Sequence, residues 1–241
     1  MTYGAAGSTR DRTREVVQEL EQRPSLTAMP HLTCIAHSRG ELVEILADYA
    51  TLGHDNLLAL HGDPPGDDPD IAPGDLRRAA ELVELAREVG DFCVGVAAHP
   101  EGHPQAPDLA TDWEHQAAKL RVADFGITQF FFRAEDYLGF VDEMQRRGVD
   151  TPIIPGVIPI TDSQQVQRFA AMSGAAMPSE LVARLDAVED DPDEVRRIGV
   201  EVVSELSERL LDEGAPGLHV YTLNRAEAPR AVHDNLNLVP A

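Results

Sequence analysis

Long apolar runs are missing from this sequence of 241 residues. No stretch approaches the roughly 20 apolar residues that a membrane-spanning helix needs. The N-terminal segment MTYGAAGSTRDRTR also lacks the apolar core of a secretory signal peptide. We therefore expect neither a membrane protein nor a secreted one, and predict that the chain is cytoplasmic.

Basic residues are scarce as well, with 20 Lys and Arg against 42 Asp and Glu, which gives a formal net charge of −22. A protein that follows the phosphates of a nucleic acid needs a basic face, so this class is not expected. The acidic residues are spread over helical stretches instead of forming a tail, which predicts a solvated surface. No nucleic-acid or membrane partner is expected. Whether the protein forms a homo-oligomer is left open by the sequence.

Cysteines are few. Cys34 and Cys93 each lie inside an apolar run, HLTCIA and DFCVGVAA, which predicts small buried side chains on strands. Neither belongs to a CxxC pair, so neither a disulfide framework nor a zinc site is expected.

What the sequence does contain is a regular alternation of short apolar runs with longer amphipathic ones. The short runs predict strands, and the longer ones predict helices. The strands are expected at 29–36, 56–61, 92–98, 125–132, 151–158 and 217–223. The helices are expected at 8–22, 39–52, 75–89, 110–121, 134–147, 162–173, 178–187 and 191–213. Pro155 and Pro159 flank Gly156, so the fifth of these strands is expected to end there.

Strands that alternate with helices in this way predict a parallel sheet and an α/β fold. A further strand stub is expected at 1–3, directly before the glycine-rich turn GAAGS. A closed barrel of this kind has eight strands. We therefore expect a single (β/α)8 TIM-type barrel domain over residues 1–241 that lacks its first βα unit, with an open doubly wound sheet as the alternative.

Polar residues follow the predicted strands, at the ends where parallel barrels carry their reactive groups. This pattern indicates an enzyme. The residues concerned are Thr2, Tyr3, His31, Thr33, His61, Gly62, Asp63, His99, Glu101, His103, Thr128, Gln129, Tyr221, Asn224 and Arg225.

Individually, these residues leave alternatives open. Asp63 follows a buried strand and a glycine, and is either a functional carboxylate or the aspartate of a turn or helix cap. Gln129 is expected to be a buried amide, either one that binds a ligand or one satisfied in the core. His99 and His103 form HPEGH, but the proline and glycine between them disfavour the unbroken helix that an HxxxH metal pair needs. No metal is expected.

Eight segments together carry a resemblance that covers essentially the whole chain in order. They are TYGAAGSTRDRT, PHLTCIAHSRGEL, NLLALHGDPPGD, GDFCVGVAAHPEGHP, ITQFFF, IIPGVIPITD, RFAAM and PGLHVYTLNRAE. In these segments the sequence resembles the methylenetetrahydrofolate reductase family.

The resemblance implies a (β/α)8 barrel that reduces 5,10-methylenetetrahydrofolate to 5-methyltetrahydrofolate, in one-carbon metabolism and methionine biosynthesis. NADH or NADPH supplies the hydride, either through FAD, as in the flavoproteins of the family, or directly. The protein has to orient the donor and handle charge, because the hydride chemistry belongs to the cofactor. Opening of the folate ring requires a proton on N10 and a negative charge near the cation that forms.

The resemblance also assigns residues. Asp63 is implied to be catalytic, stabilising the cation beside the folate. Gln129 matches the residue that holds the pterin, and Phe169 matches an aromatic that stacks near the substrate. Tyr221 and Arg225 are implied to line the folate and flavin end of the barrel. Positions that contact the cofactor in the family are held here by Thr2, His31, His61, Gly62, Ala97, His99, His103, Asp112 and Lys119.

Two departures from the family pattern qualify this reading. The family begins with a strand that carries a glutamate in an FEFFPP-like motif, the expected general acid, and no such motif is present. Because family members read SVTYG where this chain reads MTYG, we expect that Met1 is a misplaced gene start. The chain as written should then be a poor catalyst, and a non-catalytic folate-binding paralogue is the alternative.

The second departure concerns the flavin site. His61 stands where the family has an arginine, His99 where it has an aromatic, and Arg78 where it has a tyrosine. His115 and Ala118 replace an expected asparagine and arginine. Such stacking and bidentate groups carry specificity, so we expect weakened FAD binding and direct hydride transfer from NADH. A metal-dependent hydrolase would need a ligand set that the sequence does not provide.

Overall fold

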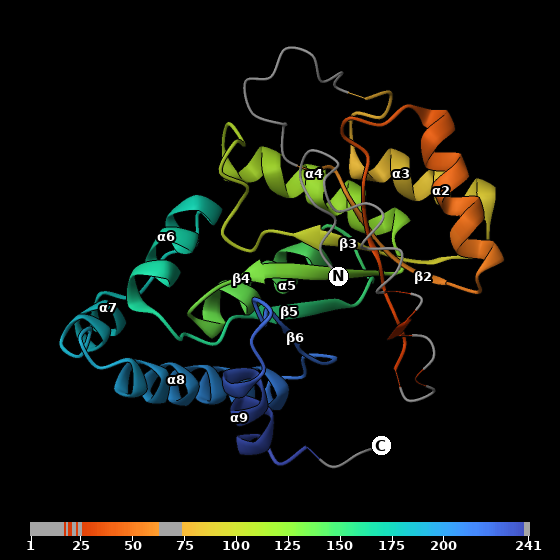
Figure 1. Cartoon of the computed structure of the whole chain (residues 1–241). Helices are drawn as coiled ribbons and strands as arrows, with labels where there is room; N and C mark the ends of the chain where they lie inside the picture. Colours follow the sequence, from red (N-terminus) through yellow and green to blue (C-terminus); the bar gives the residue numbers. More distant parts are fainter. Residues whose placement is uncertain (1–16, 18, 21–22, 24–25, 63–73, 239–241) are drawn as a thin grey trace. The chain divides into compact units, whose positions relative to one another are not determined.

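The computed structural model describes residues 17, 19–20, 23, 26–62 and 74–238 (Figure 1). It divides into two compact units. Unit 1 comprises Met1–Ala97 and Ala118–Gly126, and unit 2 comprises Ala98–Ala117 and Ile127–Ala241. The expected strand at 1–3 lies outside the described residues, as does most of the helix expected at 8–22. The single domain expected over 1–241 stays a prediction.

Unit 1 is built around three parallel strands, β1 (His31–Thr33), β2 (Asn56–Leu60) and β3 (Cys93–Ala98). Leu32 pairs with Ala59, and Leu58 pairs with Gly95, so β2 lies between the other two strands. The start of β4 (Phe125–Phe130) joins on the far side of β3, where the Asp124 N–H donates to the Val94 carbonyl oxygen over 2.9 Å.

Two helices connect these strands, α2 (Arg39–Thr51) and α3 (Ala79–Val89). Helix α2 begins where it does because Ser38 forms a capping box with Glu41, in which each side chain accepts a bond from the other residue's backbone N–H. Apolar side chains spaced three to four residues apart, such as Leu42 and Leu46, are fully buried.

Unit 2 continues the same alternation. The rest of β4 is followed by α5 (Ala134–Arg146), β5 (Ile153–Val157), three helices, β6 (His219–Val220) and α9 (Glu227–Asn235). The three helices between β5 and β6 are α6 (Ser163–Ser173), α7 (Ser179–Asp186) and α8 (Pro192–Asp212). Helix α4 (Leu109–Val122) connects β3 to β4. Strands β5 and β6 pair in parallel.

Strand order distinguishes the two folds that the sequence left open. A doubly wound sheet reverses its strand order at a switch point, whereas in a barrel each strand lies beside the next one in the chain. The order here follows the chain from β1 to β6. The fold is therefore an α/β fold of the (β/α) barrel type, as expected. Among the described residues, no helix is long and apolar enough to cross a membrane.

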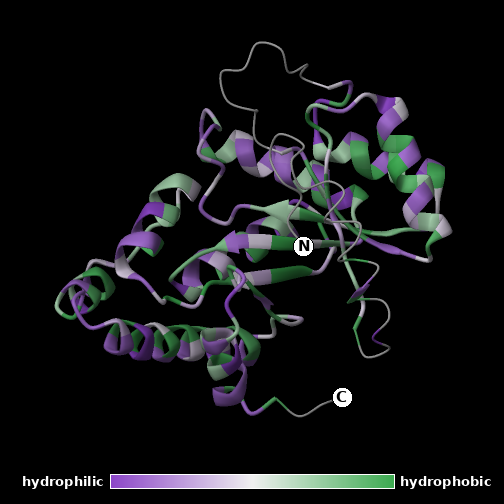
Figure 2. Ribbon diagram, viewed as in Figure 1, coloured by the Kyte–Doolittle hydropathy of each residue, from purple (hydrophilic) through white to green (hydrophobic). Residues whose placement is uncertain are grey.

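The core of unit 2 is a cluster of buried apolar residues from the end of β4, the segment after β5, and helices α6, α7 and α8. Figure 2 shows β5 as largely hydrophobic, and α8 with hydrophobic and hydrophilic residues in stripes along its length. The cluster consists of Phe130, Phe132, Ile158, Ile160, Val166, Ala170, Leu181, Leu185, Val195 and Ile198.

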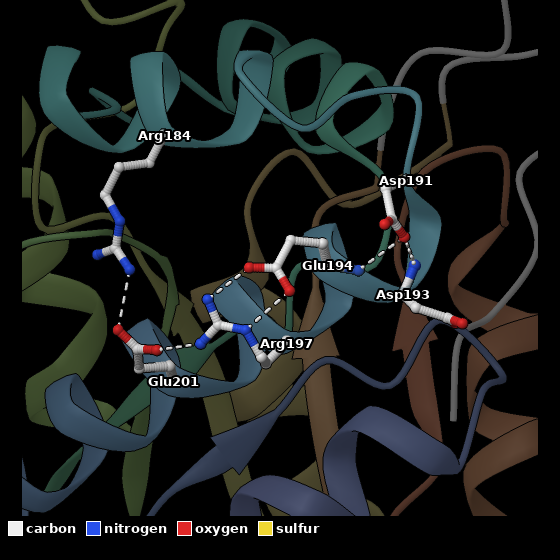
Figure 3. Close-up of polar contacts among 6 residues, drawn as sticks. All are labelled: Arg184, Asp191, Asp193, Glu194, Arg197 and Glu201. Carbon is white, nitrogen blue, oxygen red and sulfur yellow. Dashed lines mark hydrogen bonds and ion pairs between the residues drawn. The ribbon is translucent and has the colours of Figure 1, made fainter.

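The solvent face of α8 carries a line of charged contacts (Figure 3). Asp191 caps the helix by accepting bonds from the next two available N–H groups, and Pro192 occupies its first turn. Arg197 pairs with both Glu194 and Glu201, and Arg184 of α7 also contacts Glu201. Exposed pairs of this kind contribute little stability, because water and salt screen the attraction. They do show how part of the acidic surface is compensated.

Two expectations about local structure were wrong. Cys93 is exposed, because it is the first residue of β3 and burial begins only at Val94. Strand β5 continues through Pro155 and Gly156 instead of ending there. Gly156 suits this place because an added Cβ would lie 2.2 Å from the Thr128 carbonyl oxygen.

Helix α9 was not among the expected helices. Its sequence EAPRAVHDN is short and polar, and only Ala228 and Val232 are buried. With so few apolar positions, the periodicity is too weak to predict a helix.

Candidate active site

The candidate residues in unit 1 lie around β1 and β2. Thr33 is the last residue of β1, as expected, but His31 is the first, so it does not lie at the carboxyl end of the strand. His61 follows β2 and is exposed. Asp63 and Thr2 lie outside the described residues, so their placement stays a prediction.

Gly62 is required by its surroundings. Its φ of 88° is one that residues with a side chain rarely adopt. An added Cβ would lie 2.6 Å from Ile35 Cγ2 and 2.9 Å from Thr33 Cβ. The backbone directly before Asp63 is therefore packed tightly against the residues that end β1.

Two more predicted cofactor positions belong to unit 1. Ala97 is the penultimate residue of β3 and is half-buried. Lys119, in the second half of α4, is half-buried too. Their roles as cofactor contacts stay predictions.

In unit 2, side chains of α4 bind the backbone of residues 99–103, which we call the HPEGH loop. The Gln116 side chain accepts a bond from the His99 N–H over 2.6 Å and donates to the His99 carbonyl over 2.9 Å. The buried Asp112 carboxylate accepts from the His103 N–H over 3.0 Å and from Gln116 Nε2 over 2.7 Å. Gln116 and Asp112 together determine the backbone path of the loop.

The two histidines of this loop pack edge to face, with ring centroids 4.8 Å apart. His99 is half-buried and His103 is exposed. The Gln105 N–H donates to Nδ1 of His103 over 3.2 Å. No group of three His, Cys, Asp or Glu side chains in the described ranges is arranged to hold a metal ion.

Replacing Gln116 with alanine should lower the free energy of unfolding by about 2 kcal/mol, because it removes three hydrogen bonds and leaves the partly buried His99 backbone groups without this partner. Chemical denaturation followed by circular dichroism measures the change. His115→Ala is the matched control, since His115 is the exposed neighbour on the same helix. Equal stability of the two variants would contradict this account of the loop.

Thr128 holds the end of β4 in place through both of its oxygens. Its side-chain oxygen accepts a bond from the Gly156 N–H over 2.8 Å, and its carbonyl accepts from the Tyr221 hydroxyl over 2.9 Å. Burial raises the pKa of Tyr221 to about 12, so the hydroxyl stays protonated and able to donate. Thr128 directly precedes Gln129, so these bonds fix the backbone from which the Gln129 amide projects.

Gln129 itself is half-buried, not buried as expected. Its Oε1 accepts a bond from the Phe130 N–H over 3.1 Å. The side chain borders a cavity of about 10 Å³, whose lining also includes His99, Glu101 and Ser173.

The other predicted substrate residues of unit 2 lie around the ends of β4, β5 and β6. Phe169 and Tyr221 both pack against the core cluster, and the Tyr221 ring contacts Phe130 at 6.0 Å between centroids. Arg225 is exposed, and its Nη1 lies 3.4 Å from the Thr161 hydroxyl oxygen. In unit 2, Gln129, Tyr221 and Arg225 thus lie at or shortly after the carboxyl ends of β4 and β6, while Phe169 lies within α6.

Sequence reasoning missed one feature of this end. Leu223 and Asn224 both have positive φ angles, 47° and 59°, and Leu223 is 44% exposed. Consecutive residues with side chains in this conformation are strained, and such strain collects at functional sites. The asparagine after β6 could have predicted this turn, because asparagine tolerates a positive φ.

The predicted cofactor positions within the described residues do not fit a flavin dinucleotide well. A diphosphate favours arginine forks, yet His61 is exposed and an imidazole offers no such fork. The His99 ring already packs against His103, and the backbone beside it is bound by Gln116. Asp112 adds negative charge to the same loop. FAD therefore has no part in the reaction proposed below.

Taken together, the fold and the site define an α/β protein of the parallel barrel type with polar groups at the carboxyl ends of its strands, as barrel enzymes have. A family model described as "Methylenetetrahydrofolate reductase" matches residues 1–237. The chain belongs to the methylenetetrahydrofolate reductase family.

Individual relatives agree with this assignment. The chain is 39% identical over 243 residues to the 5,10-methylenetetrahydrofolate reductase of Pectobacterium carotovorum, covering 100% of this chain and 80% of that protein. It is 33% identical over 253 residues to the methylenetetrahydrofolate reductase (NADH) 1 of Arabidopsis thaliana, covering 99% of this chain and 43% of that protein.

A solved structure is similar in fold. It is an uncharacterized protein from Clostridium thermocellum that binds two copies of 5-methyl-5,6,7,8-tetrahydrofolic acid, and it matches with a TM-score of 0.60. The match covers 92% of this chain and 77% of that chain, at 15% sequence identity. At that identity the likeness supports the fold alone.

Proposed function

We propose that this protein reduces 5,10-methylenetetrahydrofolate to 5-methyltetrahydrofolate, with the hydride supplied by NADH or NADPH. The observation that carries this proposal is the family match over residues 1–237. The name of the Arabidopsis relative, which includes NADH, supports a nicotinamide cofactor. The proposed reaction belongs to one-carbon metabolism and methionine biosynthesis in the cytoplasm.

The chemistry proceeds in two balanced steps. The bond between the methylene carbon and N10 breaks, its electron pair stays on N10, and N10 takes up a proton, which leaves an iminium cation at N5. A hydride from the nicotinamide then adds to the methylene carbon, giving the N5-methyl group and the oxidised cofactor. One reduced cofactor and one proton are consumed for each folate reduced.

The proposed roles follow the strand ends. Asp63 supplies the negative charge that stabilises the N5 iminium cation. Gln129 holds the pterin by its amide, which can both donate and accept hydrogen bonds. Phe169 stacks on the substrate, and Tyr221 and Arg225 line the same end. Positioning of Gln129 by the Thr128 bonds supports this arrangement.

We further propose that the hydride passes directly from the nicotinamide to the folate. The replacement of a family arginine by His61 and of a family aromatic by His99, and the contacts that already engage His99, support this. The reducing nicotinamide then binds where the family places its cofactor, near Gly62, Ala97, His103 and Lys119.

The test uses protein expressed from the longest open reading frame that contains these 241 residues. Its absorption spectrum is recorded first, and methylenetetrahydrofolate is then added with NADH or NADPH. We expect no stoichiometric flavin band and folate-dependent oxidation of the nicotinamide. A stoichiometric flavin band would overturn direct transfer. Folate binding without nicotinamide oxidation would favour a non-catalytic folate-binding protein.

A further inference from the structure

Glu101 makes a contact that none of the roles above uses. It lies in the middle of the HPEGH loop, and its Oε1 accepts a hydrogen bond from the Ala176 N–H over 2.9 Å, across 75 positions of sequence. Ala176 lies just after α6, the helix that carries Phe169. Both partners belong to unit 2. A side chain of the loop that follows β3 therefore holds the end of the Phe169 helix.

The Glu101 side chain is half-buried, although Ala176, which donates to it, is exposed. Burial raises the pKa of Glu101, while the bond from Ala176 and the nearby Arg133 cation lower it and Asp136 raises it further. Burying a charged group costs free energy unless hydrogen bonds compensate. The Ala176 N–H provides that compensation.

A second close approach lies beside the first. Gly174 ends α6 in the left-handed conformation, with a φ of 79°. An added Cβ there would lie 3.2 Å from Cγ of Pro104, which directly follows the HPEGH loop. Ser173 and Ala175 also line the cavity of about 10 Å³ beside Glu101 and Gln129. A space of that size holds no more than about one water, so the two segments fit closely.

The contact joins two segments that are each fixed on their own side. Gln116 and Asp112 bind the loop backbone at His99 and His103. On the other side, the Gly174 and Ala175 N–H groups both donate to the carbonyl of Ala170, the residue after Phe169. The bond from Ala176 to Glu101 therefore ties the last turn of α6 to the HPEGH loop, whose backbone is itself held by Gln116 and Asp112.

We propose that Glu101 is a positioning residue that holds the last turn of α6, and with it Phe169, in place to bind the folate. The proposal rests on the folate reductase function proposed above. Glu101 acts through Ala176 and Phe169, and takes no part in the transfer of hydride or proton.

Two substitutions separate this role from simple loss of packing. Glu101→Ala removes the acceptor, whereas Glu101→Gln keeps a carbonyl oxygen that can accept from Ala176. We expect Glu101→Ala to weaken equilibrium binding of 5-methyltetrahydrofolate about fivefold, as loss of a hydrogen bond of ordinary strength predicts. Glu101→Gln should bind within about twofold of the unaltered protein. Glu135→Ala is the matched control, because Glu135 is exposed and paired with Arg209.

Hydrogen exchange of the Ala176 amide, measured without folate, reports on the contact itself. It should be faster in Glu101→Ala and unchanged in Glu101→Gln. Unchanged folate binding by Glu101→Ala overturns the proposal, and so does a loss that Glu101→Gln does not rescue. If the unaltered protein binds no folate, both the proposed function and the positioning role of Glu101 are overturned. If the unaltered protein and Glu101→Ala bind folate equally well, only the positioning role is overturned.

Discussion

Replacing Gly199 with alanine should destabilise the protein by about 3 kcal/mol or more, at the upper end of what overpacking a core costs. Gly199 is buried in the middle of α8, where the helix packs on the residues after β5. An added Cβ would lie 2.0 Å from the Ile160 carbonyl oxygen and 2.7 Å from Ile160 Cβ. Backbone atoms cannot move aside as a flexible side chain can, so α8 would have to shift.

The chain provides a matched control for this substitution. Gly139 is an exposed glycine inside α5, and an added Cβ there meets nothing within 4 Å. Alanine is favoured over glycine in helices by about 1 kcal/mol, so Gly139→Ala should stabilise slightly. Urea denaturation of both variants measures the two changes. Equal effects would show that helix propensity, and not the contact with Ile160, decides the outcome.

These two glycines illustrate what the sequence could and could not predict. Both lie in segments whose apolar spacing predicted helices correctly, because that spacing reports which face of a helix is buried. The same spacing does not say which backbone will approach that face. The contact between Gly199 and Ile160 depends on a distance between segments that only the folded chain fixes.

Some features of the candidate site were also predictable from the sequence, and others were not. Thr33, Gln129 and Tyr221 were expected at strand ends because parallel strands place their carboxyl ends together. The placement of His31 was wrong because β1 is shorter than its apolar run. The hydrogen bonds that organise the site were not predictable. Gln116 binds the His99 backbone from 17 positions away, and a lone amide within a helical pattern gives no signal of that.

Replacing Asp63 with asparagine should lower kcat for methylenetetrahydrofolate reduction by about 10² to 10³-fold, the loss seen when one preorganised electrostatic group is removed from a charged transition state. Asparagine has nearly the same shape but no negative charge to stabilise the N5 iminium cation. Because the charge acts mainly as the cation forms, binding of the uncharged ground-state ring should change much less than kcat.

Asp91→Asn is the control for this prediction. Asp91 is exposed just before β3, and its substitution removes one negative charge from the same total of −22. A long-range effect of net charge would slow both variants equally, whereas local stabilisation slows only Asp63→Asn. The measurements are steady-state kcat with NADH and equilibrium binding of 5-methyltetrahydrofolate to each variant. A kcat for Asp63→Asn within about tenfold of that of the unaltered protein would contradict the proposed role of Asp63. It would show that the iminium cation forms without the negative charge of this side chain.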